Sequence, residues 1–116
     1  MRILMLGRTP MRTSPFPKSE YRRNAYLYKI MGNPWRLEIL NILARNETSV
    51  SELAATVGLR PSAVSQHLSL LSVVKLVQSR RAGKQVYYRI VDPHILDTSV
   101  ALRNLFAGKA LKHVRF

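Results

Sequence analysis

The sequence predicts a mainly α-helical domain with a two-stranded β-wing, in the order α-α-α-α-β-β-α of a winged helix-turn-helix. Helix start and stop signals divide most of the 116-residue chain into short helices. Apolar and polar residues alternate over 85–91, which is typical of a strand. We therefore expect one domain over residues 20–108, between a flexible basic arm at 1–19 and a basic tail at 109–116.

The arm and the first two helices are predicted from proline, glycine and capping signals. Pro10, Pro15 and Pro17 interrupt the first 19 residues, which could contact DNA phosphates or drape over the domain. A first helix is expected over 20–31, ending at Gly32. Asn33 then caps a second helix over 34–45. This second helix should be the most buried because it is apolar around much of its circumference, through Trp35, Leu37, Ile39, Leu40, Ile42 and Leu43.

A helix-turn-helix is predicted over 49–72. Ser49 and Glu52 form a capping box that begins its first helix, and Gly58 ends that helix. Pro61 opens the second helix, which runs to about residue 72. Small residues, Ala54 and Ala55, permit the close crossing of two helices that this motif requires.

The second of these helices has an outer face that suits DNA recognition. Val64, Leu68 and Leu71 share its inner face by their spacing, so the outer residues are Pro61, Ser62, Ser65, Gln66 and Ser69. An amide such as that of Gln66 can pair with adenine, and the serines can bond either base edge. Arg60 suits a phosphate. The alternative is an ordinary polar helix face, and His67 is expected to be a packed, hydrogen-bonded histidine at the edge of the core.

A hairpin with strands at 77–81 and 85–91 and a turn at 82–84 forms the predicted wing. Its cations, Arg80, Arg81 and Lys84, are expected to contact backbone phosphate or a narrow minor groove. They could instead be edge-strand charges that discourage aggregation. Tyr87 and Tyr88 are interpreted as wing packing. A last helix is expected from Asp92-Pro93 to about Ala107, ending near Gly108.

Charge and composition limit the classes of function. Nineteen Lys and Arg against six Asp and Glu give a formal charge of +13, which favours a polyanionic partner. No acidic residue lies between Glu52 and Asp92. The absence of cysteine excludes disulfides and thiol chemistry and fits a cytoplasmic protein. No membrane span, signal peptide, phosphate loop or metalloprotease motif is found, so we expect neither a membrane protein nor an enzyme.

Four segments resemble the ArsR/SmtB family of bacterial repressors: 34–40 (PWRLEIL), 51–54 (SELA), 62–68 (SAVSQHL) and 83–90 (GKQVYYRI). The resemblance implies a homodimer that binds double-stranded DNA at an imperfect inverted repeat, joined through its first and last helices. The expected interface residues are Tyr21, Leu27, Tyr28, Leu96, Val100 and Leu105. The apolar last helix agrees with a dimer, although that surface could instead be covered within one chain.

The metal sites of that family are expected to be missing, and no cofactor is predicted. Ser49 and Ser51 stand where one family site has a Cys-x-Cys pair, and hydroxyls are poor ligands for soft ions. Asp92 and His94 match half of a second site, but the other half falls on Leu105 and Gly108. His113 is not placed by any pattern. An effector, if there is one, remains unidentified.

Two rival functions follow from the same sequence. A non-specific nucleic-acid-coating protein would bind with steep salt dependence and little sequence preference. Ser62, Ser65 and Gln66 argue mildly against it, because backbone binding does not need them. A winged-helix protein-interaction module that no longer binds DNA is disfavoured by the uninterrupted positive charge of residues 53–91.

Overall fold

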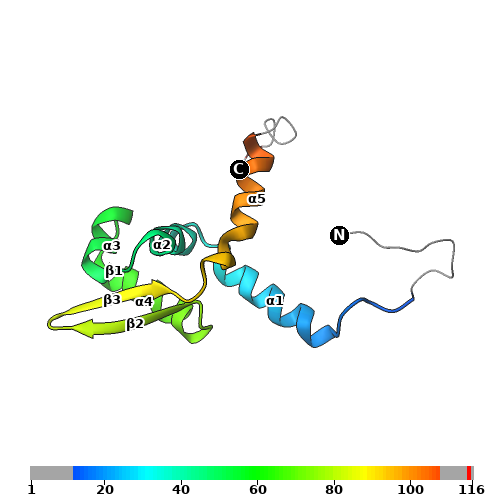
Figure 1. Cartoon of the computed structure of the whole chain (residues 1–116), viewed down its shortest axis with the longest axis horizontal. Coiled ribbons are helices and arrows are strands. Elements are labelled where there is room, and N and C mark those ends of the chain that lie inside the picture. The colour runs from blue at the N-terminus through cyan, green and yellow to red at the C-terminus, as the bar shows by residue number, and fades with distance from the viewer. Residues whose placement is uncertain (1–11, 108–114, 116) are drawn as a thin grey trace.

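A computed structural model of the chain describes residues 12–107 and 115 (Figure 1). The elements are α1 (Lys18–Met31), α2 (Pro34–Arg45), β1 (Thr48–Ser49), α3 (Val50–Val57), α4 (Pro61–Val73), β2 (Val77–Ala82), β3 (Gln85–Ile90), the 3-10 helix η1 (Pro93–Leu96) and α5 (Asp97–Ala107). The predicted mainly helical fold with a β-wing is confirmed.

Capping side chains begin three of the helices. The Asn33 side chain accepts hydrogen bonds from the first backbone N–H groups of α2, at 2.9 and 3.1 Å. Ser49 and Glu52 form both hydrogen bonds of the predicted capping box, at 3.1 and 3.3 Å. Asp92 also caps as predicted, but it begins the 3-10 helix η1. The last α-helix therefore starts at Asp97, four residues after the expected first position at Pro93.

The sheet has three antiparallel strands in the order β1-β3-β2. β2 and β3 form the predicted hairpin, which turns at Gly83, where φ is +61°. β1 was not predicted; it pairs Thr48 with Tyr88 and Ser49 with Tyr87. Two residues are too short a stretch to give a strand periodicity. Their pairing fixes the base of the wing to the segment between α2 and α3.

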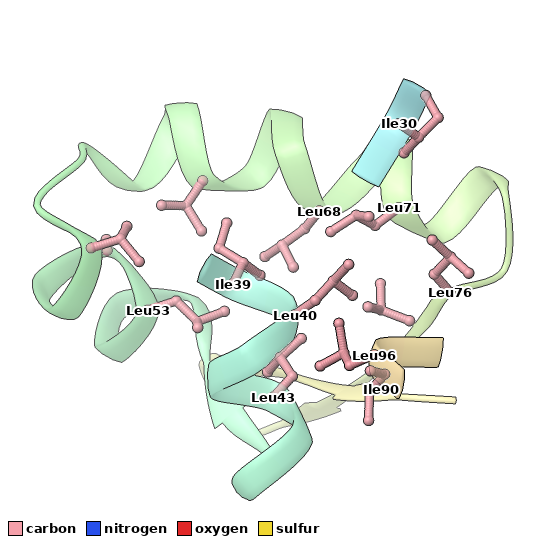
Figure 2. Packing of buried hydrophobic residues seen from close by; sticks show 14 residues of the cluster. Ile30, Ile39, Leu40, Leu43, Leu53, Leu68, Leu71, Leu76, Ile90 and Leu96 are labelled. Atoms are coloured by element: carbon pink, nitrogen blue, oxygen red, sulfur yellow. The ribbon is translucent and has the colours of Figure 1, made fainter. Parts of the chain in front are cut away.

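The core surrounds α2, whose Ile39 and Leu40 are fully buried (Figure 2). Leu53 from α3 and Leu68 and Leu71 from α4 are also fully buried. The burial of these side chains agrees with the inner faces that were predicted for α3 and α4. Trp35 was expected in the core, but it lies in the first turn of α2 and is 40% exposed.

α1 and α5 project from this core in different directions (Figure 1). Ile30, near the C-terminal end of α1, is the only buried residue of that helix, and α5 has none. α1 begins at Lys18, so the predicted arm ends two residues earlier than 19. The arm before residue 12, Gly108 and most of the tail, with His113, lie outside the described residues.

Candidate nucleic-acid interface

The helix-turn-helix is formed by α3 and α4, joined at Gly58. This glycine has φ +78°, a left-handed conformation that L side chains adopt at a cost. Ala54 and Val57 of α3 are buried with Val64 and Leu68 of α4 in one cluster. The turn and this apolar contact hold α4 across α3 with its opposite face toward solvent.

The outer face of α4 carries the residues predicted for base recognition. We call α4 the recognition helix. Exposed residues of this helix form an uncharged polar face, which consists of Ser62, Ser65, Gln66 and Ser69. Arg60 is exposed at the N-cap of this helix, where no side chain caps the backbone. A cation beside the positive end of a helix dipole suits a phosphate group. Contact of these residues with DNA stays a prediction.

The wing contains two cations that are available to a ligand. Arg81 and Lys84 are exposed on either side of the Ala82–Gly83 turn region, and neither forms an ion pair within residues 12–107 and 115. Both can therefore present their full charge to a phosphate backbone.

Arg80, which the prediction grouped with Arg81 and Lys84 at the wing tip, differs from them because it is paired within the chain. Its guanidinium donates two hydrogen bonds to Glu47, at 2.7 and 2.8 Å, and lies 4.9 Å from the ring centroid of Tyr87. The pKa of Glu47 is lowered because the carboxylate accepts these bonds. Arg80 thus attaches the wing to the segment before β1, and its charge is matched within the chain. Glu47 lies 33 residues away, so sequence spacing gave no sign of the pair.

The two wing tyrosines pack as interpreted from the sequence. Tyr88 is half-buried against the core cluster. Tyr87 is half-buried and lies under the guanidinium of Arg80. Neither ring is left free as a platform for base stacking.

His67 occupies the edge of the core, as predicted. Its Nδ1 lies 3.3 Å from Nη1 of Arg36, which was not recognised as a functional residue. Partial burial, with the Arg36 charge as a second cause, lowers the pKa of His67. Both causes favour the neutral imidazole. No local motif links the two residues, which are 31 positions apart.

The residues tested for metal binding are engaged as structural groups. Ser49 is buried, and its hydroxyl contacts Ser51 and Glu52. Asp92 Oδ1 accepts from the backbone N–H of His94, at 2.9 Å, and contacts the ring Nδ1, at 2.8 Å. This pair raises the pKa of His94 and lowers that of Asp92. Within the described part of the chain, no three metal-ligating side chains come together.

Exposed apolar side chains on α1 and on α5 make up the candidate dimer surface. It includes the predicted interface residues Tyr21, Tyr28, Val100 and Leu105, each at least 42% exposed, and Leu27, which is half-buried. Leu96 is a correction: it is 5% exposed and packs in the core, because the 3-10 turn of η1 directs it inward. Leu102 and Phe106, which belong to the same apolar last helix, are also exposed on α5. A cavity of about 180 Å³ beneath it is lined by Tyr28, Met31, Leu37, Ile95 and Leu102 among others.

None of the helices that the structure describes is long and apolar enough to cross a membrane.

Comparison with known proteins gives a consistent set of relatives. Residues 33–79 match the profile of the family described as bacterial regulatory protein, arsR family. A transcriptional repressor SmtB homolog from Synechocystis is 38% identical over 73 residues, which cover 63% of this chain and 55% of that repressor. The chain thus spans little more than half the length of this relative.

Two further matches extend over more of the chain. The biofilm growth-associated repressor of Agrobacterium fabrum is 35% identical over 96 residues, covering 81% of this chain and 82% of the repressor. A solution structure from Mycobacterium bovis superposes with a TM-score of 0.70 at 25% identity, covering 92% of this chain and 99% of that one. It is described as the homodimeric winged helix-turn-helix DNA-binding domain of a possible ArsR-family transcriptional regulator.

Proposed function

The chain belongs to the ArsR family of bacterial regulatory proteins, and from this membership we propose that it is a sequence-specific, double-stranded-DNA-binding transcriptional regulator. We propose further that it is a homodimeric repressor of an inverted-repeat operator. It would act in the cytoplasm, by binding rather than by catalysis.

One observation carries the proposal: the domain presents both an uncharged polar helix face and two wing cations that form no ion pair within residues 12–107 and 115. Ser62, Ser65, Gln66 and Ser69 supply hydrogen-bonding groups of the kind that read base edges. Arg81 and Lys84 supply charge of the kind that contacts phosphates. A protein that only coats nucleic acid needs the second set and not the first.

The dimer is supported by the apolar surface of α1 and α5 and by the homodimeric neighbour. A two-fold axis would place two recognition helices on successive half-sites, as an inverted repeat requires. We propose no resident metal, because Ser49 and Ser51 serve the start of α3 and Asp92 serves the start of η1.

The direct test is binding to the DNA upstream of the chain's own coding sequence against shuffled DNA, across a salt series. Preference for the native fragment at moderate salt is expected. Equal affinity for both DNAs that collapses as salt increases would overturn the proposal and favour a coating protein, because counterion release alone carries no sequence information.

Three substitutions separate base reading from phosphate contact. Gln66→Ala should cost about 1–3 kcal/mol of binding free energy at the cognate site and relax specificity there. Arg81→Ala should weaken binding to all sequences alike and reduce the salt slope by about 1. Arg80→Ala is the matched control, because its charge is already paired with Glu47, and it should change the salt slope less than Arg81→Ala. Equal losses on operator and random DNA for Gln66→Ala would contradict the role of that residue.

A further inference from the structure

Arg36 connects three helices through one side chain. It lies half-buried in the first turn of α2. Its Nε donates to the carbonyl oxygen of Ile30, near the end of α1, at 2.6 Å. Its Nη1 lies 3.3 Å from Nδ1 of His67 on the recognition helix. The guanidinium therefore spans from the backbone of the projecting helix α1 to the helix that carries the predicted base-reading face.

This link is unusual for the recognition helix. Otherwise α4 is fixed through apolar contacts of Val64, Leu68 and Leu71 with the core (Figure 2). Within residues 12–107 and 115, no other side chain of α4 forms a hydrogen bond to a different element. Apolar contacts are not directional, whereas a hydrogen bond is. The Arg36 contact thus restrains the orientation of α4 in a specific direction.

The chemistry of the pair defines the state in which it can form. A guanidinium only donates, so Nδ1 of His67 must accept, and the imidazole must be neutral with its proton on Nε2. Gln66 is the residue immediately before His67 on α4, so a change in the rotation of the helix at His67 also moves Gln66.

We propose that Arg36 and His67 are positioning residues for DNA reading, which hold the recognition helix in one setting relative to the end of α1. The inference rests on the proposed function, because it requires an operator to be read. A displacement of α1 moves the Ile30 carbonyl, and Arg36 passes that displacement to His67. α1 carries part of the predicted dimer surface. Binding of the second copy to α1 is therefore coupled, through Arg36 and His67, to the orientation of Gln66.

The test compares variants by the ratio of their affinities for operator and shuffled DNA. Partial unfolding lowers both affinities by the same factor, so the ratio reports only on reading by the folded protein. His67→Leu keeps an apolar side chain but removes the acceptor, and it should lower the ratio by about tenfold, the effect of losing one hydrogen bond to a charged group. Arg36→Lys keeps the charge but not the fork of donors, and it should give a similar loss.

Two controls make the result specific. His67→Asn places an amide oxygen near the position of Nδ1, so its ratio should stay close to that of the unaltered protein. Asn41→Ala removes a half-buried hydrogen bond of 2.9 Å that lies wholly within α2, and its ratio should not change. Adding Arg36→Lys to His67→Leu should cause little further loss, because both act through one contact.

The pH dependence of operator preference is a further measurement, and it should not change if His67 has a purely structural role. Arg36 on α2 is the charged group that acts on His67, and in the described chain α3 and β2, which also pack against α4, add no charge that shifts its pKa. Protonation would place an imidazolium against the guanidinium. Operator preference should therefore decline as pH falls below the usual histidine range, and His67→Asn should not show this decline.

The outcomes separate the two proposals. If the unaltered protein prefers its operator and His67→Leu shows the same preference, the positioning role alone is overturned. An unaltered protein with no preference overturns the proposed function and the positioning role together. A loss in His67→Leu that His67→Asn restores establishes the role.

Discussion

Leu68→Ala is expected to lower the free energy of unfolding by about 2–5 kcal/mol, the range measured when a buried leucine is truncated to alanine. Leu68 is 0% exposed and packs between α3, α2 and the rest of the core. Domains of this size are stable by only about 5–15 kcal/mol, so this single change removes a large part of the total. Urea denaturation followed by far-UV circular dichroism measures it.

The neighbouring position supplies the control. Ser69 is exposed on the same helix, and Ser69→Ala should change the free energy of unfolding by about 0.5 kcal/mol or less. Leu68→Ala should weaken binding to every DNA through loss of folded protein, whereas Ser69→Ala acts at the interface. A stable Leu68→Ala variant would mean that α4 does not pack on the core as described.

Leu105→Glu is expected to convert the proposed dimer to monomers and to lower operator affinity by about 100-fold or more, since avidity of two linked sites is commonly of that order. Leu105 is 45% exposed on α5, where a second copy is proposed to bind. A two-fold interface repeats each residue, so one substitution introduces two charges into the apolar contact. Sedimentation equilibrium measures the association, and titration of operator DNA measures the affinity.

Val73→Glu is the matched charge substitution outside this surface. Val73 lies at the end of α4 and is 74% exposed. It should leave the dimer intact. A dimer that persists in Leu105→Glu, or one that dissociates in both variants, would show that α5 does not form the interface.

Elements with local signals could be predicted from the sequence. Asn33-Pro34 and the Ser49–Glu52 box each place a capping oxygen beside free backbone N–H groups, and both helices start where these signals predicted. The exposed face of α4 follows from helical spacing alone. Periodicity of this kind needs no knowledge of distant residues, so it is readable in one sequence.

Features that depend on distant partners could not be predicted. The ion pair between Arg80 and Glu47 could not be predicted, because Glu47 comes from another part of the chain. Arg36 and His67 meet only because α2 and α4 cross in the core. Leu96 was assigned to a surface because a continuous α-helix was assumed, and the 3-10 turn changes the direction in which the residue points. Each of these contacts depends on tertiary geometry, which the spacing of residues in the sequence does not reveal.

None of the 11 residues of α5 is fully buried by the described part of its own chain. Helices shorter than about 12–15 residues are marginal in water unless packing stabilises them. If the second copy supplies that packing, the order of this helix and the association of two chains are one thermodynamic event. Under the proposed function, protein abundance then acts as a signal in itself: a scarce protein has an incompletely ordered α5 and single recognition helices, and an abundant one completes its own fold as it dimerises.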